Sequence, residues 1–356
     1  MRTFRSSPLP PRERGIELGE RFRDEVTGSV AAYRRLFELR AERPFDVDAW
    51  SERAWQVICE LAPAAAEEIA GIAEGSGRPV REVAAVNART ELLALANPSG
   101  STECSTVVGL PPGRPPVAVQ TWDWYERMSH NWLHWTIPHP DGRLVETVTE
   151  FGMLAKIGVN GYGVGVLLNM LHHEQDAADL AHARIGYPVH LLSRRILDEA
   201  RDLDEALRIA TGSETTASTS LTLVEGREGG GRTASVELFS GGHGVLEPTD
   251  GVLVRTNHFV SVAGSPGCLA STIGPGSLIR RKKLLDAFAG RVPDSADEVV
   301  EAMDDHDAVG GICAHPDTTL TEDFWHATLA TVSVDTLAGR LDVSAGGPCA
   351  RPVAAA

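Results

Sequence analysis

The pattern of apolar and polar positions changes character near residue 100. Residues 12–97 carry apolar side chains at a helical period, in segments that stop at helix-terminating residues such as Gly75 and Gly77. From Cys104 onward the apolar residues come in short β-rich runs separated by Gly, Pro and Asp, which predict strands. We therefore expect a mostly helical N-terminal segment followed by a region rich in β-strands.

Two clusters of predicted strands are separated by two predicted helices, at 187–200 and 202–211. Two more helices, at 276–290 and 295–306, follow the second cluster. Clustered rather than alternating elements favour an α+β fold, here two antiparallel sheets packed between helical layers. The predicted strands lie at 104–109, 115–122, 144–150, 154–160, 163–169, 218–226, 233–240, 244–251 and 252–259, and a hairpin over 326–346 turns at Leu337–Gly339.

Composition narrows the possible functions. The chain has 356 residues, a formal net charge of −16 and no basic stripe, so we do not expect it to bind nucleic acid. Residues 1–15 lack the apolar core of a signal peptide, and no apolar run of about 18 residues predicts a membrane span. The five cysteines are widely spaced without a C-x-x-C, which argues against a zinc knuckle or a disulfide framework and for a reducing compartment. We expect a cytoplasmic protein with no metal and no other cofactor.

Cys104 is the first candidate for a catalytic residue. It lies between a polar run and the first β-rich run, at a strand end from which it could project into a cleft. A lone free cysteine is more often a small buried apolar residue, and a catalytic one must be activated by a base. The chain has twelve histidines, so the pattern does not single out a histidine base. If the Glu103–Cys104 bond is cut instead, Cys104 gains an α-amine with a pKa of about 8, which can serve as the base.

Several motifs occur in order along most of the chain. They are "GIAEGSG" and "NARTEL" before the cysteine, "ECSTVVG" around it, and "VQTWDW", "TEFGMLAKIGVNGYGVGVLLNML", "RTNHF", "SLIRRKKLLDAF", "GICAH" and "GGPC" after it. Through these motifs the chain resembles the acyl-CoA:6-aminopenicillanic acid acyltransferase family of N-terminal nucleophile hydrolases. The resemblance implies a four-layer αββα core. It also implies self-cleavage into an α subunit, residues 1–103, and a β subunit, residues 104–356, which stay associated.

The resemblance implies roles for individual residues. Cys104 matches the nucleophile, which an N-to-S acyl shift releases after the resulting thioester is opened by water. The family often has Gly before this cysteine; here the residue is Glu103, whose carboxylate could act as a local base. Asp123 matches the acid that orients the nucleophile and its amine; otherwise it is a satisfied polar residue between two core tryptophans.

Three further residues match the family's site. Asn257 matches an oxyanion-hole donor, a contribution of roughly 3 kcal/mol to acyl transfer, or else is a turn residue. Asn169 resembles a second polar group lining that site, or else is a cap. Arg280, in an S-x-x-R pattern with Ser277, matches a residue that supports the nucleophile or binds a substrate carboxylate; the alternative is a solvated helix face. Related hydrolases have Arg where this chain has Gln120, whose role stays open.

The resemblance implies a cysteine amidohydrolase or acyltransferase that cleaves a linear amide, or a thioester such as an acyl-CoA, through an acyl-Cys104 intermediate. Water is the expected acceptor, and transfer to an amine is the alternative. The Glu103 departure leaves open an unprocessed relative that binds an acylated ligand without turnover. The adjacent histidines His172 and His173 suggest a metal-dependent hydrolase as a third alternative. No third ligand lies at a useful spacing, however, so we expect these histidines to be solvated or capping residues. Tryptophans in 122–135 are expected in the core, and some could line an acyl pocket.

Overall fold

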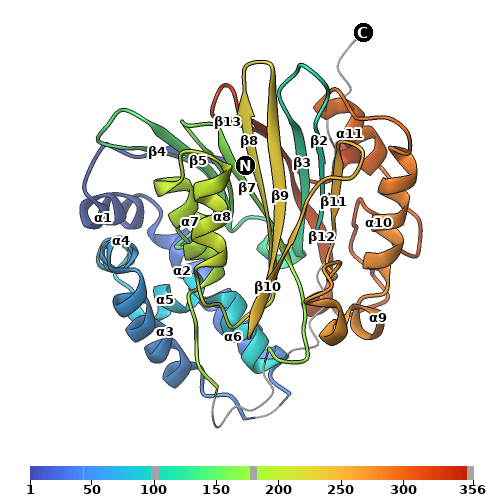
Figure 1. The fold of residues 1–356 in the computed structure, drawn as a ribbon. Coiled ribbons are helices and arrows are strands. Elements are labelled where there is room, and N and C mark those ends of the chain that lie inside the picture. Colours follow the sequence, from blue (N-terminus) through green and yellow to red (C-terminus); the bar gives the residue numbers. More distant parts are fainter. Residues whose placement is uncertain (43, 98–103, 177–182, 351–356) are drawn as a thin grey trace.

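Two β-sheets pack face to face between helices in the computed structural model (Figure 1), which describes residues 1–42, 44–97, 104–176 and 183–350. The larger sheet has the order β1-β4-β5-β6-β7-β8-β9-β10, and the smaller has the order β11-β2-β3-β12-β13. Neighbouring strands are antiparallel except β1 and β4, which pair in parallel. The strands are β1 (Arg2–Arg5), β2 (Ser105–Gly109), β3 (Val117–Tyr125), β4 (Trp132–Pro138), β5 (Leu144–Glu150), β6 (Ile157–Asn160), β7 (Val164–Met170), β8 (Thr219–Arg227), β9 (Gly230–Phe239), β10 (Gly242–Leu246), β11 (Val252–Arg255), β12 (His326–Asp335) and β13 (Arg340–Ala345).

Helices cover the outer face of each sheet. Helices α7 and α8 contact strands β6 to β9 of the larger sheet, whereas α10 and α11 contact β2, β3 and β11 of the smaller one. Between the sheets, β2 meets β7, and β12 and β13 meet β6. This arrangement confirms the expected α+β fold with four layers. The helices are α1 (Pro11–Arg21), α2 (Arg23–Arg40), α3 (Val47–Leu61), α4 (Pro63–Ser76), α5 (Val80–Asn87), α6 (Arg89–Ala96), α7 (Val189–Glu199), α8 (Leu203–Thr211), α9 (Ala270–Ile273), α10 (Gly276–Ala287) and α11 (Ala296–Met303), with short 3-10 turns η1 (Glu126–Met128), η2 (Ser265–Gly267), η3 (Glu322–Phe324) and η4 (Pro348–Ala350).

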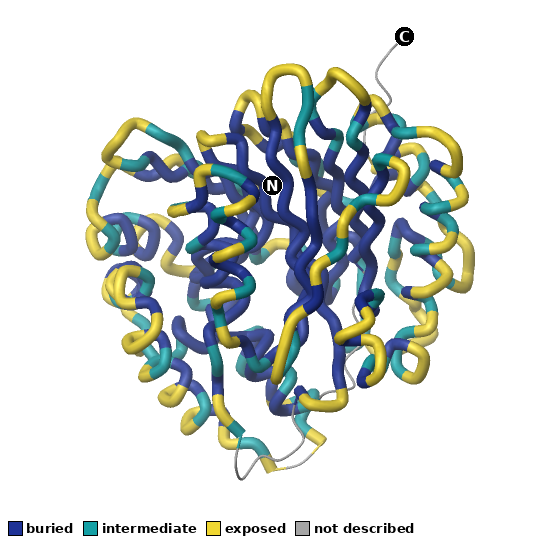
Figure 2. The backbone as a smooth tube through the Cα atoms, in the orientation of Figure 1, coloured by how far each residue is buried: buried dark blue, intermediate teal, exposed yellow. Residues whose placement is uncertain are grey.

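The N-terminal segment is helical, as expected, and packs beside the larger sheet (Figure 1). Most strands are buried along most of their length, β1, β10 and β13 being more exposed, while most helices expose their outer faces (Figure 2). None of the described helices is long and apolar enough to cross a membrane.

Helices α1 and α4 cross with their backbones in contact. A Cβ on Gly71 would lie 2.0 Å from the Arg12 carbonyl oxygen, and a Cβ on Gly15 would lie 2.1 Å from the Glu68 carbonyl oxygen. Larger residues do not fit at this crossing, so the first glycine of "GIAEGSG" has a packing role. The buried Glu68 carboxylate also pairs with Arg14 and with Arg194 of α7, which ties the N-terminal helices to the core.

The assignment of strands to sheets differs from the order of the predicted clusters. Strands β2 and β3 of the first cluster belong to the smaller sheet, and β5, β6 and β7 belong to the larger one. Strands β1 and β4 had no counterpart among the predicted strands. Strand β1 has only four residues, and β4 lies in the tryptophan-rich segment, where aromatic residues obscure a period of two.

Candidate active site

The Cys104 backbone is held from two sides at the start of β2. Its carbonyl oxygen accepts a hydrogen bond from Asn169 Nδ2 at 3.0 Å and one from Arg280 Nη1 at 2.9 Å. The side chain is 6% exposed, and its Sγ lies 3.7 Å from the Asp123 carbonyl oxygen. Cys104 is therefore buried and fixed in orientation by residues from β7, α10 and β3.

Arg280 is fully buried and connects three parts of the chain. Besides the Cys104 carbonyl, it donates to Ser105 Oγ at 2.8 Å and to Asn257 Oδ1 at 2.9 Å. One turn earlier on α10, Ser277 Oγ accepts a hydrogen bond from the Asn257 backbone N–H at 2.8 Å. The two ends of the S-x-x-R pattern thus bind the same asparagine, and Arg280 is not part of a solvated helix face.

The two asparagines are oriented by their neighbours. Asn257, just after β11, donates from Nδ2 to the Met170 carbonyl oxygen at 2.9 Å. Asn169, on β7, accepts a hydrogen bond from Thr106 Oγ1 at 2.9 Å while its Nδ2 holds the Cys104 carbonyl. Both amides are buried between the sheets, so neither is a surface turn or cap residue.

Asp123 lies on β3 and is 1% exposed. Its Oδ1 accepts a hydrogen bond from Thr328 Oγ1 of β12 at 2.7 Å. The register between β3 and β12 shifts just after Thr328. The structure thus places Asp123 beside Cys104, but it leaves the role of the carboxylate untested.

Gln120 has a structural role in joining the two sheets. Its Nε2 donates to the Leu168 carbonyl oxygen at 2.6 Å, and its Oε1 accepts from the Leu168 N–H at 3.1 Å. This pair of bonds satisfies both backbone groups of Leu168. Glu103, by contrast, lies outside the described residues.

Sequence analysis did not identify a buried charged cluster that lies beneath the tryptophans of β3. Glu150 accepts from Lys156 Nζ at 2.6 Å, contacts Arg89 Nε at 3.2 Å and hydrogen-bonds the Tyr33 hydroxyl. Lys156 Nζ lies 3.5 Å from the centroid of the Trp122 ring. The available signal was that Arg89, Glu150 and Lys156 lie in segments expected to be buried. Buried charged side chains must pair with one another.

The electrostatic surroundings of Cys104 favour a neutral thiol. Burial raises the pKa of the thiol to about 12, and the Asp123 carboxylate acts in the same direction. The charges of Lys156 and Arg280 oppose this rise. Burial in turn lowers the pKa of the Lys156 ammonium, against the attraction of Glu150. In the uncut chain the sulfur is therefore protonated near neutral pH and needs a base to react.

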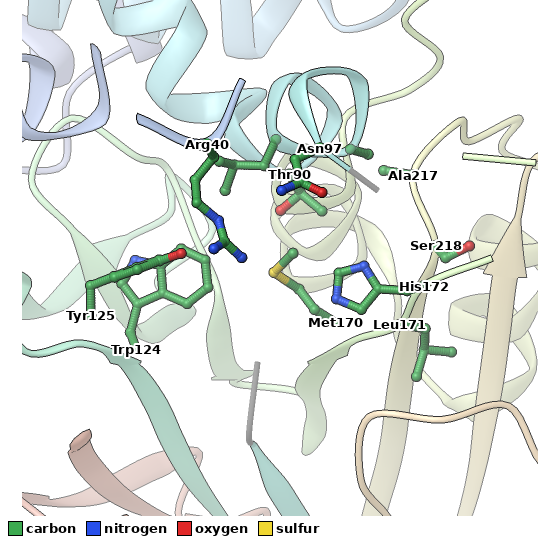
Figure 3. A pocket seen from close by; sticks show the side chains of 12 residues that line it. Arg40, Thr90, Asn97, Trp124, Tyr125, Met170, Leu171, His172, Ala217 and Ser218 are labelled. Atoms are coloured by element: carbon green, nitrogen blue, oxygen red, sulfur yellow. The ribbon is translucent and has the colours of Figure 1, made fainter. Parts of the chain in front are cut away.

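A narrow pocket with a cavity volume of about 20 Å³ adjoins the charged cluster of Arg89, Glu150 and Lys156 through Trp124. Trp124 and Met170, which line it, directly follow Asp123 and Asn169 in the sequence. Aromatic and apolar side chains form much of its wall, and the Arg40 guanidinium points into it (Figure 3). The lining residues are Arg40, Thr90, Leu93, Ala94, Asn97, Trp124, Tyr125, Met170, Leu171, His172, Ala217 and Ser218.

The histidine pair does not form a metal site with other described residues. His172 lines the pocket, whereas the His173 ring stacks on Phe239 with centroids 4.8 Å apart. Neither belongs to the cluster of possible metal ligands found among the described residues. That this pair holds no metal stays a prediction.

Comparison with known proteins identifies the family. The family described as acyl-coenzyme A:6-aminopenicillanic acid acyl-transferase matches residues 112–350, about two thirds of the chain. The chain belongs to this family. The match begins after Cys104, so family membership by itself does not identify the nucleophile.

One sequence relative agrees with this assignment. The 40 kDa form of the acyl-coenzyme A:6-aminopenicillanic-acid-acyltransferase of Emericella nidulans is 27% identical over 251 residues, which span 70% of this chain and 67% of that protein. Among solved structures, penicillin V acylase from Agrobacterium tumefaciens has a TM-score of 0.40 at 11% identity, covering 68% of this chain and 82% of its own. A variant of conjugated bile acid hydrolase from Clostridium perfringens has a TM-score of 0.38 at 11% identity, covering 67% and 92%. Structural likeness at this level carries no argument about function.

Proposed function

We propose that the protein is a self-processing acyl-transfer enzyme whose nucleophile is Cys104. The observation that carries this proposal is the clamp on Cys104: Asn169 and Arg280, from distant parts of the chain, bind its carbonyl oxygen at 3.0 and 2.9 Å. A cysteine that only filled space in the core would not need its backbone fixed by a buried cation. Membership of an acyl-transferase family supports the reaction class.

Processing begins at the bond between Glu103 and Cys104. The Cys104 sulfur attacks the Glu103 carbonyl carbon, the C–N bond breaks, and the thiol proton passes to the nitrogen. Water then opens the thioester, which leaves a carboxylate on Glu103 and a free thiol and α-amine on Cys104. The clamp on the Cys104 carbonyl supports this step because it fixes the attacking residue, and positioning contributes strongly to reactions within one molecule.

The processed enzyme would use the new α-amine as its base. An α-amine has a pKa of about 8, so roughly a tenth of it is neutral at pH 7, and this fraction can take the thiol proton. Asp123 would orient the amine, and Asn257 would donate to the oxyanion of the acyl intermediate. The Asn257 amide is suited to this because Arg280 and the Met170 carbonyl fix its orientation.

Contacts across the cleavage point should hold the two fragments together. The buried Glu68 carboxylate of the first fragment pairs with Arg194 of the second at 2.9 Å. Asn87 donates to the Gly152 carbonyl oxygen at 2.7 Å and accepts from the Leu154 N–H at 3.0 Å. Breaking buried pairs of this kind costs several kcal/mol, so residues 1–103 and 104–356 would remain one particle.

The pocket of Figure 3 marks where the acyl group of a small-molecule amide or thioester would enter. Its cavity of about 20 Å³ has room for about one water molecule, so its side chains would move apart to admit the group. Trp124, Tyr125 and Met170 offer apolar surface, and Arg40 offers a positive charge for an anionic group. The acyl group then passes to water or to an amine. Assays of one amide substrate with and without amine acceptors distinguish these routes, because acyl-amine formed at a competitive rate contradicts pure hydrolysis.

Intact mass under denaturing conditions tests the proposal. The native sequence should give two fragments whose masses add up to the 38.1 kDa chain plus one water. Cys104→Ala should give one uncut, inactive chain, while Cys59→Ala, at an exposed cysteine, should cut and react normally. Cleavage that survives Cys104→Ala removes the mechanism. An uncut, inactive native chain that still binds acylated ligands would instead support a binding protein.

A further inference from the structure

Two histidines and two cysteines meet beside the last turn of the described chain. They are His306, after α11; Cys313 and His315, in the loop before β12; and Cys349, in η4. One ligand atom from each lies within 4.8 Å of the other three. Cys313 is buried and the other three are exposed, so an ion can reach the group from solvent.

The distances among Cys313, Cys349 and His315 match edges of a tetrahedron around zinc. With Zn–S of about 2.3 Å and Zn–N of about 2.0–2.1 Å, tetrahedral ligands stand about 3.8 Å apart for S···S and about 3.6 Å for S···N. Here the two sulfur atoms are 3.5 Å apart, and His315 Nε2 lies 3.7 Å from Cys313 Sγ and 3.5 Å from Cys349 Sγ. His306 is the fourth candidate ligand: its ring stacks on the His315 ring with centroids 5.1 Å apart, and one of its nitrogens lies within 4.8 Å of the other three ligand atoms.

We propose that His306, Cys313, His315 and Cys349 bind one zinc ion. Two thiolates and two imidazoles are a ligand set that favours zinc over calcium or magnesium, which prefer oxygen. Four protein ligands leave no open position for substrate, so the ion is structural. It joins the loop before β12 to the turn after β13 and so closes the chain around the β12–β13 hairpin.

The backbone around the cluster allows the C-terminal turn to lie close to Cys313. A Cβ on Gly347 would lie 2.4 Å from Cys313 Sγ, so only glycine lets the C-terminal turn come this near. Ala314, between two of the ligands, donates its N–H to Thr328 Oγ1 and accepts from the Thr328 N–H, both at 3.0 Å. The same Thr328 hydroxyl donates to Asp123 Oδ1 at 2.7 Å. Zinc at this site would therefore stabilise the loop before β12, which Thr328 connects to Asp123 beside Cys104.

Metal content and metal spectra test the site independently of any activity. The full chain, freed of any histidine tag and kept under reducing conditions, should contain one zinc per chain by mass spectrometry of the metal. Chelator-stripped protein should take up one cobalt(II) and show the visible absorption of a tetrahedral thiolate site. Stripping should also lower the melting temperature, and added zinc should restore it.

Variants locate the ligands. Cys349→Ser and His315→Ala should each lose stoichiometric zinc and the cobalt spectrum, whereas Cys59→Ser, at an exposed cysteine outside the cluster, should keep both. Cys104→Ala should also keep both, which separates this test from that of the proposed nucleophile. Less than stoichiometric zinc uptake by the reduced native chain overturns the proposal. So does zinc retained by both ligand variants, or a Cys313–Cys349 disulfide in protein whose thiols were blocked at cell lysis.

Discussion

Replacing Arg280 by methionine should slow self-cleavage far more than it weakens the fold. The change keeps an unbranched side chain but removes three donated hydrogen bonds, to the oxygens of Cys104, Ser105 and Asn257. The Cys104 carbonyl keeps its bond from Asn169, so it stays satisfied but is held from one side only.

The cost in stability follows from the acceptors left behind. A buried acceptor that loses a donor costs about 1–3 kcal/mol, and Ser105 Oγ and Asn257 Oδ1 both lose the bond from Arg280. The Arg280 cation is 0% exposed and is itself costly to bury, so removing it recovers part of this free energy. We expect a net loss of about 2–4 kcal/mol, which a domain with roughly 5–15 kcal/mol of stability survives. The effect on cleavage is separate: misplacement of the attacking group by about 1 Å costs on the order of 100-fold in rate.

The assay is a time course of the uncut chain, followed by denaturing gel and intact mass, beside urea unfolding of the same samples. Lys282→Met is the matched control, because Lys282 lies on the same helix and pairs with Asp286 at the surface. Arg280→Met should cleave on the order of 100-fold more slowly, and the control at the native rate. Arg280→Lys, which presents one ammonium in place of the guanidinium fork, should recover part of the rate. Native cleavage by Arg280→Met, whatever its stability, would refute the positioning role of this residue.

Two predictions concern stability, both measured by urea unfolding. Gly71→Ala should lower the free energy of unfolding by about 1–3 kcal/mol, because its Cβ would meet the Arg12 carbonyl oxygen at 2.0 Å. Gly28→Ala on α2, whose Cβ would lie at an ordinary 3.9 Å from Asn131 Oδ1, should raise it by roughly 0.5–1 kcal/mol. Equal effects at the two glycines would contradict the backbone contact between α1 and α4. Burial raises the pKa of Asp176 to about 7, so the folded chain keeps a proton that the unfolded chain loses between about pH 4 and 7, and stability falls as pH rises through that range. Asp176→Asn should reduce this fall, and an unchanged pH slope would show that the carboxyl is ionised in the fold.

The sequence predicted the layers of the fold better than it predicted which strands pair within each sheet. Apolar periodicity is a local property, and it correctly located β2, β3 and the helix α10, which the structure places within a few residues of the expected bounds. The choice of sheet depends on contacts between distant segments. Strand β2 pairs with β11, about 145 residues later, because Val107 and Val254 of those strands must share one apolar layer against α10 and α11. A pattern read along the chain cannot show that pairing.

The candidate site shows the same difference between what local sequence predicts and what depends on distant contacts. Cys104, Asp123, Asn169, Asn257 and Arg280 were found through motifs, and the structure brings them together, although their catalytic roles remain proposals.

Other groups gave no such local signal. Lys156 and Glu150 stand in separate β-rich runs and become a pair only when the turn between β5 and β6 brings them within 2.6 Å. Cys313 and Cys349 are separated by a whole hairpin, so their spacing argued against a metal site, yet their sulfur atoms lie 3.5 Å apart. A hairpin returns the chain to its starting point, so it brings residues far apart in sequence together at its open end. Ligand spacing is therefore informative within one loop, and it loses its meaning when a strand pair lies between the ligands.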